Sequence, residues 1–346
     1  MKKITVVIWG YGAMGKGIAE MLLKKKGVEI TGVCDTHPKL VGKSFLAPLD
    51  YEGEHPDVMV EADIEALLDR TEASVVMIAT DSFTKKSYDK IETVLKRGIN
   101  VISTAEEMAY PKANEPKLAE KMDALAKANH ATILGTGINP GFVMDLLVVA
   151  MSGVMSDVES IQATRVNSLS PFGPTVMEEQ GVGISPETFE KRLTEGSLSG
   201  HVGFKESVMM IADALGAPID RFEQQMKPIM TSIDRKSKYG EAKAGHLAGI
   251  DMTAQGFRGK EVFIDMKHPQ QIEPELEGTQ TGDYITIKGT PEINLSVKPE
   301  IDGGIGTIAM CVNMIPHVLN ASPGLKTMID LPVPRAILGD MRDLLD

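Results

Sequence analysis

The sequence contains few cysteines, few aromatic residues and no excess of basic charge. Only two of its 346 residues are cysteines, Cys34 and Cys311, which is too few for a disulfide framework or a cysteine-rich zinc site. Aromatic residues make up 5% of the chain, and 48 Asp and Glu outnumber 36 Lys and Arg, which gives a net charge of −12. An acidic surface repels phosphate backbones and anionic headgroups. We therefore expect a cytoplasmic protein that binds neither nucleic acid nor a membrane surface.

Long apolar runs are also missing. The first run, Ile4–Trp9, stops at Gly10 and is shorter than the core of a signal peptide, which has about 7–15 residues. The most apolar stretch, Ala131–Met155, is interrupted by Pro140 and Asp145, whereas a membrane helix needs about 20 continuous apolar residues. A chain of this length and composition is expected to form two globular domains.

The first third of the chain alternates between strand-like and helix-like segments. Short runs rich in Val and Ile, bounded by Gly, Asp or Asn, are typical of buried parallel strands. Segments with helical periodicity lie between them, so we predict a doubly wound α/β sheet with right-handed crossovers. The predicted strands are Ile4–Trp9, Glu29–Cys34, Ser74–Ala79, Asn100–Ser103 and Ala131–Leu134, and the predicted helices are Met14–Lys26, Ile64–Arg70, Ser87–Arg97 and Glu115–Ala128.

A glycine motif, G-Y-G-A-M-G at Gly10–Gly15, joins the first predicted strand to the first predicted helix. This is the context of the dinucleotide-binding fingerprint. Gly10 allows the tight turn, Gly12 lets the backbone approach a pyrophosphate, and Gly15 lets the helix pack against the strand. The helix N-terminus offers free N–H groups to the anion. The predicted pyrophosphate contacts are Gly10, Gly12, Ala13, Met14 and Gly15.

The residues after the second predicted strand bear on the choice between NAD and NADP. Asp35 lies 20 residues after Gly15, where a carboxylate accepts hydrogen bonds from the ribose hydroxyls. Its charge favours NAD, because it would repel a 2′-phosphate. Thr36, His37 and Lys39 follow directly and leave NADP open.

The ends of the later predicted strands carry small and hydroxylic residues, which let a nicotinamide ribose lie across the sheet edge. Glu106 and Glu107 are adjacent in a mostly apolar turn, where burial and like charge are expected to raise a pKa. One of them is a candidate proton acceptor, and the alternative is a pair of solvated acids or a helix cap. The further predicted cofactor contacts are Ala79, Thr80, Asp81, Ser103, Thr104 and Asn139.

Beyond Gly141 the pattern becomes that of a mixed α+β domain. Met226–Val297 is strand-like, with a turn expected at Gly282-Asp283, and Gly303–Leu319 is a strongly apolar helical segment. Such a final helix often packs on the nucleotide domain. We therefore expect a Rossmann domain from residues 1–140 plus about 303–346, with an inserted substrate and oligomerisation domain at about 141–302. A strand at Asp157–Asn167 and helices at Pro186–Glu195 and Gly203–Leu215 are also predicted.

Several longer segments resemble one enzyme family over nearly the whole chain. The sequence is similar to the 2,4-diaminopentanoate dehydrogenases of ornithine fermentation and to the related native amine dehydrogenases. Dihydrodipicolinate reductases are more distant, because their paired-histidine motif is missing among the seven histidines here. The segments that carry the resemblance are Ser103–Pro111, Gly135–Asp145, Arg165–Gly173, Met177–Gly181, His201–Gly203, His268–Glu275 and Gly303–Pro334.

The resemblance implies NAD(P)-dependent, reversible deamination of an amine-bearing carbon, with an amine, a ketone or aldehyde, and ammonia as small-molecule partners. It assigns proton transfer to the Ser-Thr-Ala-Glu-Glu turn, which leaves Glu106 and Glu107 as alternatives. An amino-acid substrate needs a cation for its carboxylate, and the planar fork of Arg165 suits that task. The resemblance makes His268 the second carboxylate contact; from the pattern alone, Arg165 could instead be a surface ion-pair residue and His268 a loop histidine without a ligand. Asn167, which follows in the same strand as Arg165, and His201, as a contact to the α-amino group or to the nicotinamide domain, are further candidates. We also expect a homodimer.

Two other functions stay open at this point. One is a non-catalytic protein that senses a dinucleotide, because fold does not fix function. The other is a different dehydrogenase, acting on an amino-aldehyde or semialdehyde. An aldehyde dehydrogenase needs a reactive cysteine, and we expect Cys34 and Cys311 to be buried. No metal is expected, because H-E-x-x-H, C-x-x-C and Asp-rich motifs are missing.

Overall fold

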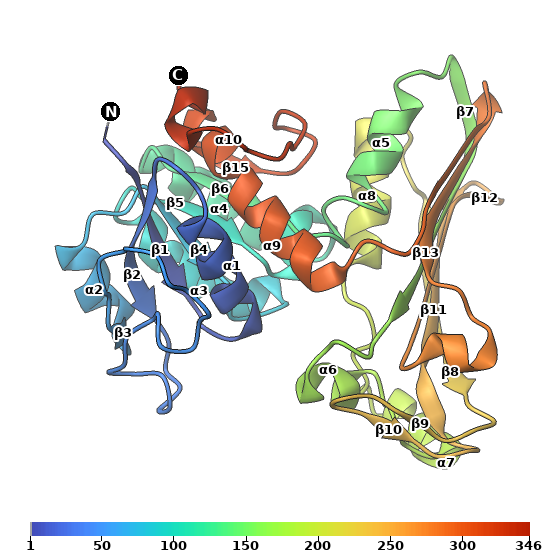
Figure 1. Cartoon of the computed structure of the whole chain (residues 1–346). Coiled ribbons are helices and arrows are strands. Elements are labelled where there is room, and N and C mark those ends of the chain that lie inside the picture. Colours follow the sequence, from blue (N-terminus) through green and yellow to red (C-terminus); the bar gives the residue numbers. More distant parts are fainter. Residues whose placement is uncertain (1) are drawn as a thin grey trace. The chain divides into compact units, whose positions relative to one another are not determined.

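The computed structural model of the chain describes residues 2–346. It divides into two compact units. The first unit runs to Phe142 and is completed by Asp302–Asp346, and the second unit is Val143–Ile301. Both ends of the chain therefore belong to the first unit (Figure 1).

The first unit is built on a seven-stranded parallel sheet, which confirms the predicted doubly wound α/β fold. Its strand order is β15-β6-β5-β4-β1-β2-β3. The order reverses between β1 and β4, and such switch points are where doubly wound sheets bind ligands, outside the carboxyl ends of the strands. The strands are β1 (Ile4–Trp9), β2 (Val28–Cys34), β3 (Val60–Glu61), β4 (Val75–Ile78), β5 (Asn100–Ser103), β6 (Thr132–Gly135) and β15 (Gly324–Lys326).

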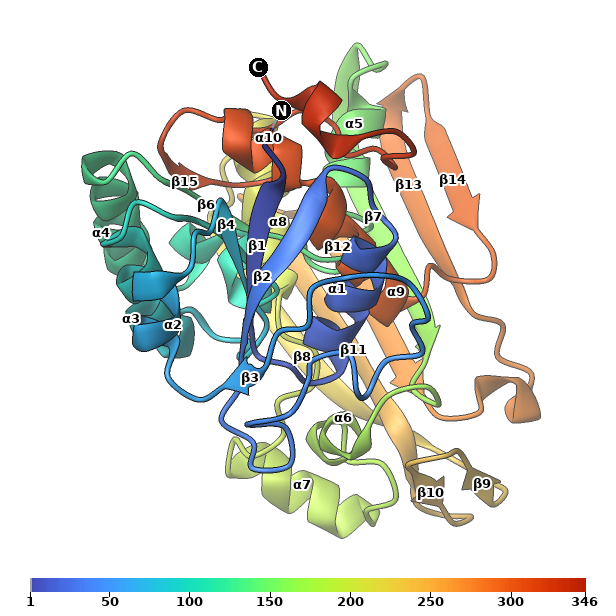
Figure 2. The same cartoon turned by 60° about the vertical axis from the view of Figure 1, so that its left-hand side comes forward.

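Helices cover both faces of this sheet (Figure 2). On one face lie α2 (Ile64–Arg70), α3 (Thr84–Leu95) and α4 (Pro116–Ala128), whose apolar stripes bury a core with the strands. On the other face lie α1 (Ala13–Leu23) and α9 (Gly303–Asn313), which pack so closely that a Cβ on Gly17 would collide with Ile308. The remaining helices of the unit are η1 (Glu106–Ala109), η2 (Pro111–Ala113), α10 (Ile315–Asn320) and η4 (Met341–Leu344).

The second unit contains a mixed six-stranded sheet of order β14-β13-β7-β12-β11-β8, in which only β7 and β12 are parallel. One face is covered by α5 (Leu146–Ser152) and α8 (Phe204–Ala214), and no helix of this unit lies on the other face within the described chain (Figure 1). The strands are β7 (Asp157–Ser168), β8 (Arg221–Met230), β11 (Leu247–Arg258), β12 (Glu261–Gln271), β13 (Gly282–Thr290) and β14 (Ile293–Val297).

Smaller elements complete the second unit. They are α6 (Pro174–Glu179), α7 (Pro186–Thr194), η3 (Pro274–Glu277) and the two-stranded hairpin β9 (Arg235–Lys236) and β10 (Glu241–Ala242). Arg235 is buried and joins this hairpin to the chain after β12, because its guanidinium donates to Gln271 Oε1 at 2.7 Å and to the carbonyl of Ile272 at 2.9 Å.

Two local predictions were wrong. The turn expected at Gly282-Asp283 is the start of β13, where Asp283 pairs with Arg165 of β7. The single helix expected over Gly303–Leu319 is divided into α9 and α10, because Pro316 has no N–H to donate and its ring obstructs the preceding turn.

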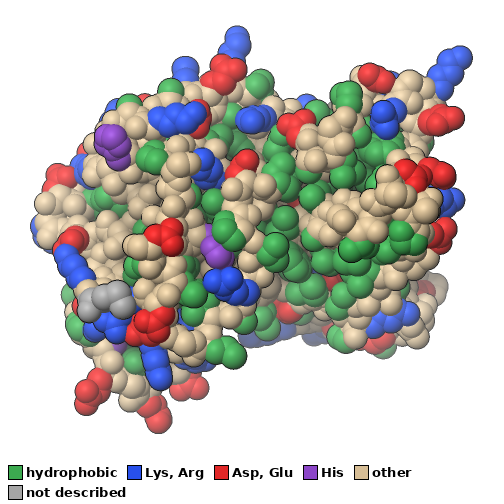
Figure 3. All heavy atoms as spheres, turned by 90° about the horizontal axis from the view of Figure 1, so that it is seen from above, with side chains coloured by type: hydrophobic (Ala, Val, Ile, Leu, Met, Phe, Trp, Pro, Cys, Tyr) green, Lys and Arg blue, Asp and Glu red, His purple; other side chains and the backbone are tan. Residues whose placement is uncertain are grey.

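The described residues 2–346 contain no helix that is long and apolar enough to cross a membrane. On the face seen in Figure 3, basic and acidic side chains are interspersed and form no extended patch of one sign.

Candidate active site

The glycine loop between β1 and α1 leaves room for a ligand at the helix N-terminus. Gly10 has a φ of +96°, and a Cβ there would lie 2.6 Å from the carbonyl oxygen of Ala79. A Cβ on Gly15 would collide with the Gly10 carbonyl oxygen, whereas a Cβ on Gly12 would meet no atom of the described chain within 4 Å. Gly12 is the N-cap of α1 and supplies no capping side chain. The N–H groups at Ala13 and Met14 therefore begin a helix whose dipole favours an anion.

Asp35 holds the glycine loop against the end of β2. Its Oδ2 accepts from Tyr11 N at 2.6 Å and its Oδ1 accepts from His37 N at 2.7 Å. Thr36 lies exposed between them. Each carboxylate oxygen has a second lone pair, so these bonds leave acceptors for ribose hydroxyls. The Tyr11 side chain is buried and donates to the Phe45 carbonyl at 2.6 Å, an anchor that the glycine spacing alone does not reveal.

The residues predicted at the later strand ends lie along the same carboxyl edge of the sheet. Ala79 follows β4 and donates to the Trp9 carbonyl at 2.8 Å, so it adjoins the end of β1. Asp81 pairs with Lys90 of α3, and this pair together with Thr80 lowers the pKa of the carboxyl, against the opposing effect of burial. Ser103 ends β5, Thr104 donates to the Ile78 carbonyl at 3.0 Å, and Asn139 lies in the loop after β6.

The structure gives one of the two adjacent glutamates, Glu107, a contact to a neighbouring helix. Both lie in the first turn of η1. Glu107 accepts from Thr84 N at 2.8 Å through its Oε2 atom, and its own N–H donates to the Ser82 carbonyl at 3.1 Å. Phe83, the N-cap of α3, has no side-chain acceptor. Glu107, from a later part of the chain, therefore caps that helix instead. This contact gives Glu107 a structural task in the fold.

The second unit buries an ion pair on the helix-covered face of its sheet. Arg165 of β7 donates through Nη1 to Asp283 Oδ1 at 2.6 Å and through Nη2 to the Ile301 carbonyl at 2.5 Å. The side chains are 2% and 3% exposed. Asp283 also accepts from Ile301 N at 2.9 Å through Oδ2. Arg165, predicted as a carboxylate contact, therefore already has a counter-ion.

Two histidines form a compact group with Asn167 on the same face. His268 Nε2 donates to Asn167 Oδ1 at 2.8 Å, and the rings of His268 and His201 are 4.6 Å apart and nearly perpendicular. Phe204 packs edge-on against the His201 ring at 5.2 Å. The predicted substrate contacts Arg165, Asn167, His201 and His268 all belong to this one unit.

Burial keeps both histidines neutral. It lowers the pKa of His201 to about 3, with a smaller contribution from the Arg165 charge. Burial likewise lowers the pKa of His268 well below its ordinary value, helped by His201 and Arg165. The two histidines therefore offer hydrogen bonds, and they carry no charge near neutral pH.

One buried polar group of this face was not predicted from the sequence. Gln270 of β12 is 6% exposed, and its Nε2 atom has no hydrogen-bond partner among the described residues. His201 Nε2 is unpartnered in the same way. Gln270 stands in a segment already singled out, but only the register of β12 against β7 indicates that it lies opposite Asn167.

Neither cysteine is suited to be a nucleophile. Burial raises the pKa of both thiols to about 12, and for Cys34 the nearby carboxylates of Asp35, Glu61 and Asp63 add to the effect. A thiolate is the reactive form, so thioester chemistry of the aldehyde dehydrogenase kind has no candidate here. Over residues 2–346, no three His, Cys, Asp or Glu side chains converge as metal ligands would.

The doubly wound sheet and its glycine loop define a dinucleotide-binding domain, and the comparisons identify the chain as a nicotinamide-dependent oxidoreductase. Residues 4–136 match the oxidoreductase family with an NAD-binding Rossmann fold, and residues 142–346 match the C-terminal domain of 2,4-diaminopentanoate dehydrogenase. The chain belongs to the 2,4-diaminopentanoate dehydrogenase family.

Individual relatives extend over the whole chain. The 2,4-diaminopentanoate dehydrogenase of Acetoanaerobium sticklandii is 57% identical, with 100% of this chain and 98% of the relative covered. An amine dehydrogenase of Streptomyces virginiae is 24% identical, with 96% and 98% covered. The structure of an amine dehydrogenase from Mycobacterium smegmatis superposes with a TM-score of 0.87 at 24% identity, over 97% of this chain and 98% of that one. The last similarity shows that the fold is shared, and the family resemblance expected from the sequence is confirmed.

Proposed function

We propose that the protein catalyses the NAD(P)-dependent oxidative deamination of 2,4-diaminopentanoate to 2-amino-4-oxopentanoate and ammonia, together with the reverse reductive amination. The observation that carries this proposal is the 57% identity to a 2,4-diaminopentanoate dehydrogenase along the full chain. In the forward direction the ammonium substrate, the oxidised cofactor and water give the ketone, ammonium, the reduced cofactor and one proton.

The glycine loop and Asp35 are proposed to hold the cofactor. The pyrophosphate would lie on the N–H groups at Ala13 and Met14, and Asp35 would accept from the ribose hydroxyls. Gly12 supports this fit, because the space beside its Cα is open. The nicotinamide, when bound, supplies the hydride acceptor. The proposed contacts to its ribose are Ala79, Thr80, Asp81, Ser103, Thr104 and Asn139.

Glu106 is proposed as the proton acceptor. Hydride leaves a carbon that bears a neutral amine, so the ammonium must first lose a proton to a base. Glu106 would then release that proton to solvent and, as a carboxylate again, take a proton from the water that attacks the imine. The cap that Glu107 forms on Thr84 N supports this choice between the two.

Arg165, Asn167, His201 and His268 are proposed to bind the amino-acid end of the substrate. Arg165 has five N–H donors, so its bonds to Asp283 and Ile301 leave donors for a carboxylate. The neutral histidines add hydrogen bonds without adding charge.

A substrate panel tests this function. Reductive amination with ammonia is measured for 2-amino-4-oxopentanoate, cyclohexanone and small aldehydes, each with NADH and NADPH. We expect the highest kcat/KM for the amino-keto acid. A preference for cyclohexanone or an aldehyde would instead indicate a general amine dehydrogenase.

We further propose that the protein is a cytoplasmic homodimer joined through the open face of the second unit's sheet. Two buried free thiols suit a reducing compartment.

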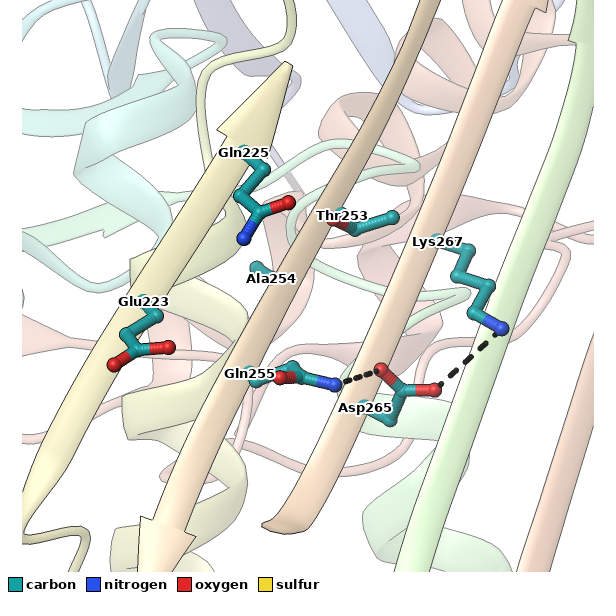
Figure 4. Close-up of a pocket in the computed structure, with 7 residues that line it drawn as sticks. All are labelled: Glu223, Gln225, Thr253, Ala254, Gln255, Asp265 and Lys267. Atoms are coloured by element: carbon teal, nitrogen blue, oxygen red, sulfur yellow. Dashed lines mark hydrogen bonds and ion pairs between the residues drawn. The ribbon is translucent and has the colours of Figure 1, made fainter. Parts of the chain in front are cut away.

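The open face is polar, and Figure 4 shows Asp265 of β12 between Gln255 and Lys267, with Gln255 Nε2 donating to Asp265 at 3.1 Å. Among the described residues, no helix of the second unit covers this face, so its side chains are accessible to a second copy. Sedimentation velocity tests this: we expect a dimer that Thr253→Arg weakens, and a monomeric wild type would contradict it.

A further inference from the structure

Gln270 occupies a position from which it can contact the same ligand as the histidine group. On a strand, residues two apart point to the same side, so Gln270 and His268 of β12 share a face. In register, Gln270 lies opposite Asn167 of β7 and Ile250 of β11. Asn167 in turn accepts the bond from His268. Gln270, Asn167 and His268 are therefore contiguous on the helix-covered face.

The unpaired amide nitrogen of Gln270 requires an explanation. Buried polar groups are almost always hydrogen-bonded, and each exception merits a functional reason. Gln270 is 6% exposed, and its Nε2 finds no acceptor in residues 2–346. The next residue provides a contrast, because the Gln271 side chain is equally buried but its Oε1 accepts from Arg235 at 2.7 Å. The Gln271 side chain thus has a partner within the fold, whereas the Nε2 donor of Gln270 has none in the described chain.

The chemistry of this group selects the ligand. An amide nitrogen is a donor only, so its partner must offer an acceptor. Arg165 lies on the same face; Asp283 balances its charge, but the Arg165 guanidinium has N–H donors beyond those used in that pair, and the histidines stay neutral. An anionic oxygen is the acceptor that such surroundings favour.

We propose that Gln270 is a specificity-determining residue that donates a hydrogen bond from Nε2 to the carboxylate of the substrate. This rests on the proposed function, since only an amino-acid substrate brings that carboxylate. Gln270 acts on recognition and not on the reacting carbon, so its contribution is to KM for carboxylate-bearing substrates.

Gln270→Met tests this, because methionine has a similar shape and no donor. A hydrogen bond to a charged group corresponds to about a 10- to 150-fold change in affinity. We expect Gln270→Met to lower kcat/KM for 2-amino-4-oxopentanoate by at least about 10-fold, mainly through KM. Activity on cyclohexanone should stay close to that of the wild type. Gln270→Glu, which replaces the donor by a like charge, should impair the amino-keto acid reaction more severely.

Thermal denaturation and a neighbouring variant provide the controls. Because Gln270 leaves a buried donor unpaired in the free protein, Gln270→Met should match or exceed the wild-type Tm. Gln271→Met should lower the Tm and leave the ratio of kcat/KM for the two substrates unchanged. Equal losses on both substrates, or a Tm lowered as in Gln271→Met, would overturn the inference about Gln270 and leave the proposed function standing. A wild-type enzyme that aminates cyclohexanone but not the amino-keto acid would overturn the proposed function together with it.

Discussion

Arg165 and Asp283, which are 118 residues apart in the chain, form a buried ion pair with 2.6 Å between Nη1 and Oδ1. Removing one partner of such a pair leaves an uncompensated charge, which costs about 3–5 kcal/mol. Arg165→Met should therefore lower the free energy of unfolding by about that amount. Chemical denaturation measures the change.

A double variant separates this structural task of Arg165 from substrate binding. Arg165→Met combined with Asp283→Asn removes both charges, so most of the lost stability should return. If Arg165 also binds the substrate carboxylate, the double variant should still show a reduced kcat/KM for 2-amino-4-oxopentanoate, while cyclohexanone is little affected. If the double variant keeps the wild-type ratio of kcat/KM for the two substrates, Arg165 serves the fold only.

The glycine loop allows ligand binding to be separated from folding. A Cβ on Gly12 meets nothing in the protein, whereas a Cβ on Gly15 collides with Gly10. Gly12→Val should therefore keep the wild-type Tm and abolish NADH binding, as measured by fluorescence titration. Gly15→Val should lower the Tm itself. Full NADH affinity in Gly12→Val would refute the placement of the pyrophosphate.

The two glutamates should respond in opposite ways to the same substitution. Glu106→Gln is expected to lower kcat by about 100-fold or more, the scale of general acid–base catalysis. Glu107→Gln should retain most of the activity. Glu107→Ala should lower the free energy of unfolding by about 1 kcal/mol, because the N–H of Thr84 loses its cap. Steady-state kinetics of Glu106→Gln near the wild-type rate would place the proton acceptor elsewhere.

The buried histidines predict a loss of stability in acid. The pKa of His201 is about 3 in the folded protein, against 6.5 for an ordinary histidine. As the pH falls below about 6.5, the unfolded chain gains a proton at this residue that the folded protein does not take up. Each such histidine therefore costs about 1.4 kcal/mol per pH unit down to the folded pKa.

Denaturation curves at pH 7.5 and pH 5 test this dependence. His201→Gln should reduce the difference in stability between the two pH values. An unchanged difference in His201→Gln would show that His201 already takes up a proton in the folded protein.

Local chemistry determined what the sequence could predict. The glycine spacing and the apolar strands report requirements within a few residues, so the α/β sheet was predictable from sequence. The start of β13 was not, because Asp283 is placed by its pairing with Arg165 of a distant strand. The division of the last apolar helix could have been predicted from Pro316 alone.

The same distinction applies to the candidate site. Adjacent carboxylates marked Glu106 and Glu107 together, but the capping contact of Glu107 depends on α3, whose Thr84 N donates to it. Gln270 has no local signal at all, since an amide becomes informative only when burial leaves it without an acceptor. These properties arise from tertiary structure.

The parallel sheet of the first unit has a consequence for synthesis on the ribosome. Its edge strand β15 and the helix α9, which packs on α1, come from beyond Asp302. Domains usually fold in the order in which they emerge, but this one cannot be completed until nearly the whole chain has been made. The second unit is contiguous in sequence, so we expect it to reach its folded state first, while the nascent first unit waits with an unpaired strand edge.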